Sequence, residues 1–202
     1  MGSASGALAR LGAALCAATV VAACAGGAVH PRGAATVPTV PPTTGDPWAV
    51  PSTIDAAYID RVLAFLDHMQ GEALRSVRQS NSLTSRYQTI EAAIRADAHE
   101  IRLQDALQRQ NIAAGWPNIS AVPGDRYSQV QRILQSGPTC IVAAVNEDFS
   151  RLTVAKPVPY PQWYVGLLHS DQSMVNPTHW AISYDGYESA GGVPDAPCEM
   201  KS

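Results

Sequence analysis

Four residues in the C-terminal half of the chain could together perform acid–base chemistry. His169 is followed closely by Asp171, and His179 and Tyr184 lie on the next predicted strand. Acid–base catalysis needs an imidazole and a carboxylate that converge in one pocket, and these residues lie near strand ends, where a pocket can open. Alternatively, His169 and His179 are edge residues bonded to nearby backbone groups. We treat the four as a candidate pocket and assign no catalytic residue.

The sequence lacks the short motifs that identify common enzymes and metal sites. It contains no Gly-x-Ser-x-Gly, no phosphate-binding loop, no dinucleotide fingerprint, and no Cys-x-x-Cys or His-x-x-x-His pair. The net charge is −3 and no basic block is present, which argues against nucleic acid as a partner. The sequence therefore predicts no metal and no cofactor, and it favours a protein that is not an enzyme.

Two of the four cysteines are placed to form a disulfide bond. Cys140 opens a predicted strand, and Cys198 lies in a tail rich in glycine and proline. In an oxidising compartment such a pair usually joins, and the bond would pin a tail that has no hydrophobic period of its own. The alternative is two free thiols, one buried and one exposed.

The elements that must position these residues begin with helices. Apolar residues over 54–69 have helical spacing, which predicts a first helix that begins near residue 52. Gly71 is expected to kink or interrupt this helix. Asp67 and His68 fall on its more exposed side.

Two more helices are predicted before the sheet. The first covers residues 84–110, and its charged face is expected to be solvated. That face consists of Glu91, Arg95, Asp97, Glu100, Arg102, Asp105 and Arg109. The second is a short helix over 126–137, capped by Asp125 and stopped by Gly137. Its inward residues would be Val130, Ile133 and Leu134.

The pattern then changes to that of strands. In the last strand segment, Trp180, Ile182 and Tyr184 alternate with smaller or polar residues. Short links between the segments indicate an antiparallel meander, and helices followed by strands predict an α+β fold with the helices packed on the sheet. The strand segments are residues 139–147, 151–156, 162–170 and 178–187.

The N-terminus carries the pattern of an export signal. Residues 11–23 form an apolar run that is long enough for a signal peptide and too short for a membrane span. The run ends in Val21-Ala22-Ala23-Cys24, which resembles the lipobox of bacterial lipoproteins. The resemblance implies cleavage between Ala23 and Cys24, lipidation of Cys24, and anchoring at the outer face of the cell membrane. An ordinary secretory signal, cut near Ala23 or Ala28, and a cytosolic protein are the alternatives.

The chain therefore divides into three parts. Residues 1–23 are the predicted signal peptide, residues 24–52 a lipidated cysteine with a Pro-rich tether, and residues 53–202 a single globular domain. Trp48, near the end of the tether, is expected to cover an apolar edge of the domain.

The order of elements resembles a known fold family. A long first helix ending near "LDHMQGEALRS", further helices and then a curved meander are similar to the nuclear-transport-factor-2-like (NTF2-like, SnoaL-like) cone fold. The lipobox, Pro/Thr tether and small α+β domain also resemble actinobacterial lipoproteins. The resemblance implies a sheet that wraps around a pocket, in a protein that is either a small-molecule enzyme or a binding module.

Three functions follow from these expectations. The first is a membrane-anchored binding or accessory module that uses a pocket or an exposed aromatic edge to hold a small ligand or an envelope protein. The second is an assembly subunit of a cell-envelope complex, and the third is a small-molecule enzyme of the cone fold. The aromatic edge consists of Trp163, Tyr164, Trp180 and Tyr187.

Overall fold

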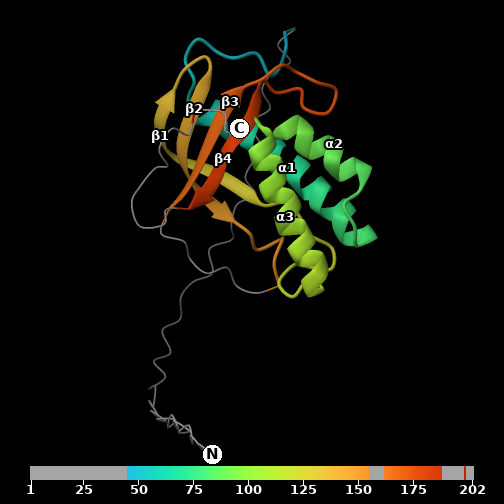
Figure 1. Cartoon of the computed structure of the whole chain (residues 1–202). Helices are drawn as coiled ribbons and strands as arrows, with labels where there is room; N and C mark the ends of the chain where they lie inside the picture. The colour runs from blue at the N-terminus through green and yellow to red at the C-terminus, as the bar shows by residue number, and fades with distance from the viewer. Residues whose placement is uncertain (1–44, 155–161, 188–197, 199–202) are drawn as a thin grey trace, which may run out of the picture. The chain divides into compact units, whose positions relative to one another are not determined.

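The computed structural model describes residues 45–154, 162–187 and Cys198 (Figure 1). Three helices precede four strands, which confirms the α+β class. The predicted signal peptide, Cys24 and most of the tether lie outside the described residues. The elements are α1 (Ala56–Ser80), α2 (Ser85–Ile94), α3 (Ala98–Ala114), β1 (Tyr127–Ser136), β2 (Cys140–Asp148), β3 (Trp163–His169) and β4 (Trp180–Tyr187).

Helix α1 starts later than predicted and runs unbroken through Gly71. Its N-cap is Asp55, whose side chain accepts a hydrogen bond from the Tyr58 backbone N–H at 2.8 Å. Gly71 does not kink the helix. A methyl group at Gly71 would collide with the carboxylate of Asp125, which accepts a hydrogen bond from Arg75 at 2.8 Å. The glycine therefore makes room for a contact between α1 and the segment before β1.

The single helix predicted over 84–110 is wrong, because the chain breaks between α2 and α3. Arg95 adopts extended backbone angles, and the Ala96 N–H donates to the Ile182 carbonyl of β4 at 2.8 Å. This hydrogen bond to β4 replaces the one that the Ala96 N–H would donate, in a continuing helix, to the carbonyl four residues earlier. Asp97 then caps α3 by accepting from the Glu100 N–H at 2.9 Å.

The short helix predicted over 126–137 is also wrong, because these residues form β1. The strand pairs with β2 in antiparallel register, which shifts between Val130 and Arg132 and again between Ile133 and Gln135. Each shift inserts an extra residue, and the first one places the half-buried Val130 and Ile133 three positions apart. Apolar residues three positions apart are also typical of a helix, which explains why the sequence pattern predicted one here. Leu134, predicted to point inward, is exposed.

The sheet has the predicted antiparallel meander, in the order β1-β2-β3-β4. Residues 151–154, predicted to begin a further strand, instead form turns and one bridge between Thr153 and Ile119. Residues 155 and 156 lie outside the described part of the chain.

The core lies between the helices and one face of the sheet (Figure 1). Inward residues of β2 and β3 meet the apolar stripe of α1, and Trp180 of β4 is fully buried there. The Trp180 indole N–H donates to the Tyr58 hydroxyl at 2.8 Å. Trp48 packs edge-on against Phe65 of α1, with ring centroids 5.4 Å apart, as expected for a residue that covers an apolar edge. The largest fully buried side chains are Trp180, Tyr87, Ile59, Leu63, Leu66, Ile94, Ile141, Leu167 and Ile182.

Candidate functional site

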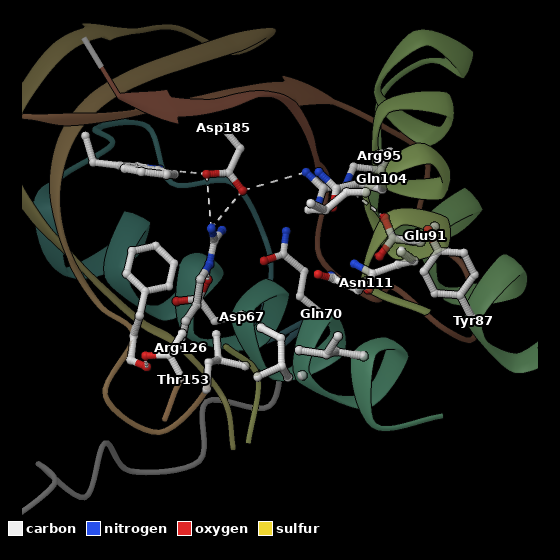
Figure 2. Close-up of a pocket in the computed structure, with 18 residues that line it drawn as sticks. Asp67, Gln70, Tyr87, Glu91, Arg95, Gln104, Asn111, Arg126, Thr153 and Asp185 are labelled. Atoms are coloured by element: carbon white, nitrogen blue, oxygen red, sulfur yellow. Dashed lines mark hydrogen bonds and ion pairs between the residues drawn. The ribbon is translucent and has the colours of Figure 1, made fainter. Parts of the chain in front are cut away.

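A cavity of about 320 Å³ lies between the helices and the sheet (Figure 2). All three helices contribute to its wall, together with β3, β4 and the loops on either side of the β1–β2 hairpin. Its charged lining residues are Asp67, Glu91, Arg95, Arg126 and Asp185, and its apolar ones include Leu74, Leu107, Ile119, Phe149 and Leu152. We call the five charged residues the charged floor of the cavity; amide and apolar side chains make up most of the remaining lining.

Arg126 is the centre of the charged floor. Its Nε donates to Asp67 Oδ1 at 2.7 Å, and its Nη1 donates to Asp185 Oδ1 at 3.0 Å. The second oxygen of Asp67 accepts from the Ser128 backbone N–H at 2.9 Å. Arg126 immediately precedes β1, and the alternation of the strand turns Arg126, Ser128 and Val130 toward the helices. One arginine thus joins α1 to β4 from inside the fold.

Asp185 connects this centre to a second arginine. It accepts from the Trp163 indole N–H at 2.7 Å, and its Oδ2 lies 3.7 Å from Arg95 Nη1. The Nε of Arg95 donates to Glu91 at 3.0 Å. These contacts form a chain of buried charges from α1, across the sheet, to the end of α2 (Figure 2). The charged face of the predicted second helix is therefore not solvated throughout, because Glu91, Arg95 and Glu100 are buried.

The environment shifts the pKa values of the carboxyl groups in different directions. Burial raises the pKa of Asp67 despite its pairing with Arg126. Burial also disfavours the ionised form of Asp185, but the charges of Arg126 and Arg95 outweigh it and lower the pKa of this carboxyl. Burial raises the pKa of Glu147, which lies behind Arg126 and accepts from the Ser128 hydroxyl, to about 8. Burial therefore favours the protonated form of Glu147.

Three nitrogen atoms of the lining residues make no hydrogen bond within the described part of the chain. They are Nη2 of Arg126, Nη1 of Arg95 and Nε2 of Gln70. Both arginines are more than nine-tenths buried, with 8% of Arg126 and 6% of Arg95 exposed. Figure 2 shows the amide of Gln70 pointing into the space between the two arginines. Buried donors of this kind cost free energy unless water or a ligand satisfies them.

Helix α3 supplies the remaining wall. Its contribution consists of amide side chains and one leucine: Gln104, Leu107, Gln108 and Asn111. Only Glu100 and Gln108 of this helix are buried, and Leu107 is 46% exposed although it also lines the cavity. Leu107 therefore lies where the cavity meets the surface.

The candidate pocket from the sequence does not coincide with this cavity. His169 and His179 stack with ring centroids 5.5 Å apart, and His179 contacts Asp46 at 3.3 Å. Asp171 is exposed on the loop after β3, and none of the four candidate residues lines the cavity. Tyr184 pairs with Gly166 in the β3–β4 register, three residues along β3 from His169. The structure thus joins the two histidines but places Tyr184 apart from them.

The other sequence candidates also fall elsewhere than expected. Tyr164 and Trp180 are buried, so they do not form an exposed aromatic edge, and Trp163 is half-buried with its indole bonded to Asp185. Asp67 is predicted on the more exposed side of the first helix, but only 2% of it is exposed. Cys140 and Cys198 are paired, with Cα atoms 5.8 Å apart.

In comparisons with known proteins, the chain matches no family model, no curated protein and no solved structure. Within the described residues, no cluster of three or more His, Cys, Asp or Glu side chains could hold a metal ion. No helix of that same part is long and apolar enough to cross a membrane. Function therefore has to be inferred from the cavity itself and from the N-terminal sequence.

Proposed function

We propose that the protein is an exported lipoprotein whose folded domain binds a small molecule at the outer face of the cell membrane. The apolar run over 11–23 and the lipobox-like Val21-Ala22-Ala23-Cys24 support export and lipidation. The pairing of Cys140 with Cys198 is of the kind that an oxidising compartment favours. The tether then connects the lipid anchor to the binding domain.

One observation carries the binding part of the proposal: a cavity of about 320 Å³ is lined by charged residues, by buried donors without a partner and by apolar side chains. Cavities that bind small molecules combine these two features. Binding is favoured over catalysis because the carboxylates are already engaged. Asp67, for example, accepts from Arg126 and Ser128 with its two oxygens, which leaves it poorly placed to take a proton from a substrate.

The NTF2-like cone is part of this proposal. It is supported by the order of helices and antiparallel strands, and by a cavity between the helices and one face of the sheet. In that fold the sheet wraps around a pocket, which agrees with a binding role for the cavity.

Cell fractionation tests the anchoring part. The wild-type protein should be found in the membrane fraction, and Cys24→Ser should move it to the soluble exported fraction, because the lipid would have no attachment site. Cys16→Ser is the matched control, since Cys16 lies in the segment that is expected to be removed. If Cys24→Ser stays in the membrane fraction, the lipid anchor at this residue is wrong.

Thermal unfolding of the full-length protein in detergent tests the binding part. Toluene, cyclohexanol and hexanamide are added separately, and unfolding is followed by tryptophan fluorescence. A ligand that binds only the folded state raises Tm. Leu107→Trp should abolish the rise by filling the cavity, whereas Leu103→Trp, one turn away on α3 and 49% exposed, should not. If no compound gives a rise that Leu107→Trp removes, the binding function is wrong.

A further inference from the structure

The charge and the free donors of the cavity together restrict what it can hold. Three carboxyl groups line it, and two guanidinium groups oppose them. The carboxylates are Asp67, Glu91 and Asp185, and the guanidinium groups belong to Arg95 and Arg126. The floor therefore already holds more carboxyl groups than guanidinium groups, and adding an anionic group beside these carboxyls would be electrostatically unfavourable.

The unsatisfied atoms argue against a cationic ligand. Asp67 accepts through both oxygens, Asp185 accepts from Trp163 and Arg126, and Glu91 accepts from Arg95. Four lining atoms still lack a partner among the described residues: the Tyr87 hydroxyl, which can donate or accept, and one nitrogen atom each of Arg126, Arg95 and Gln70. The three nitrogen atoms are donors. An ammonium group brings only donors, so it would leave all three unsatisfied. A ligand that satisfies them must bring hydrogen-bond acceptors.

We propose that the cavity binds an uncharged amphiphile, whose carbonyl or hydroxyl oxygen accepts from Arg126 Nη2, Arg95 Nη1 or Gln70 Nε2. The apolar body of the ligand lies against Leu74, Ile119 and Leu152, and it reaches toward Leu107 at the surface. This assignment rests on the proposed function, because it takes the cavity to be the binding site. It adds the chemical class of the ligand.

A series of three probes with the same six-carbon chain tests the assignment on the unmodified protein. Hexanamide is neutral, hexanoate is an anion and hexylammonium is a cation at pH 7, and their dissociation constants are measured by calorimetry with the full-length protein. Hydrogen bonds to charged donors are worth enough to separate ligands by about tenfold or more. We expect hexanamide to bind at least ~10-fold more tightly than either charged probe.

A variant in the lining sharpens the test. Gln70→Leu removes one donor and keeps the volume, so it should weaken the binding of hexanamide relative to that of toluene by about 3- to 10-fold. Gln110→Leu, an exposed glutamine of α3 outside the lining, is the matched control and should change neither. The comparison among the three probes needs no variant, so it decides the assignment even if Gln70→Leu does not fold.

The outcomes separate this inference from the proposed function. If hexanoate or hexylammonium binds best, or if all three probes bind equally, the neutral-amphiphile assignment is overturned. In that case toluene or cyclohexanol can still raise the Tm of the wild type but not that of Leu107→Trp, and the binding function then stands. If no compound binds in that manner, the binding function itself fails.

Discussion

The two walls of the cavity are built on different principles. The wall formed by α1 and the sheet is held by buried ion pairs, in which Arg126 joins Asp67 to Asp185. The wall formed by α3 is held by few buried side chains, and it places leucines at 49% and 46% exposure on its surface. Buried charges require fixed partners, whereas an exposed leucine requires none.

The two walls are therefore expected to have different roles in ligand binding. The ion-paired wall fixes the positions of the donor groups, because Arg126 is held by carboxylates from two separate elements. The α3 wall contributes amide side chains and Leu107, and only two of its residues are buried. Local opening is expected where few apolar groups are buried, so α3 is the side through which a ligand would enter.

The largest effect should follow from breaking the ion-paired wall. Arg126→Met removes the one cation between Asp67 and Asp185, which leaves two buried carboxylates with weakened or missing partners. Loss of one member of a buried pair typically costs about 3–5 kcal/mol, and we expect a loss of this size in the free energy of unfolding by urea. Arg109→Met, on the exposed surface of α3, should change it by less than about 0.5 kcal/mol. Equal losses in the two variants would contradict the distinction between the walls.

A smaller effect should follow from the protonation of Glu147 in the same wall. Its pKa is about 8 in the folded protein and 4.5 as an ordinary carboxyl, so between these pH values the folded state holds a proton that the unfolded state has released. The free energy of unfolding therefore falls as pH rises from about 4.5 to 8. Glu147→Gln cannot ionise and can still accept from Ser128.

Urea unfolding of the wild type and Glu147→Gln at several pH values measures this effect. The variant should be about as stable as the wild type near pH 5 and about 1–3 kcal/mol more stable above pH 8. Asp67 and Asp185 are present in both proteins, so the difference between the two curves reports the ionisation of Glu147 together with its coupling to these two groups. Parallel curves from pH 5 to 9 would show that Glu147 is not protonated in the folded state.

The fold class and the meander could be predicted from the sequence, but the composition of the site could not. Simple alternation along β4 from Trp180 and Ile182 selects Tyr184 as the next inward residue. The β3–β4 register shifts at this point, because Ile182 pairs with Leu167 and Tyr184 pairs with Gly166. The extra residue reverses the alternation, and Asp185 faces the cavity instead.

The inward positions of Glu147 and Asp67 follow from the local pattern of buried residues, but their charge makes them look like surface residues. Glu147 continues the inward alternation of Ile141, Ala143 and Val145 along β2, and Asp67 falls four residues after the buried Leu63 on α1. A charged residue at an inward position is ordinarily assigned to solvent, because burying it alone is costly. The cost is met here by Arg126, and a partner so distant in sequence is not visible in any local pattern.

The smallest effect should separate two leucines that line the cavity from opposite walls. Leu74 of α1 packs against the core, whereas Leu107 of α3 is 46% exposed. Leu74→Ala should therefore lower the free energy of unfolding by about 1–2 kcal/mol and Leu107→Ala by less than about 0.5 kcal/mol, because the cost of truncation grows with how deeply the removed atoms are packed. Both variants enlarge the same cavity, so a difference between their free energies of unfolding in urea reflects how tightly each wall is packed. If Leu107→Ala proves as costly as Leu74→Ala, α3 is bound to the fold as firmly as α1, and ligand entry past α3 would require opening of comparable cost to that of the core.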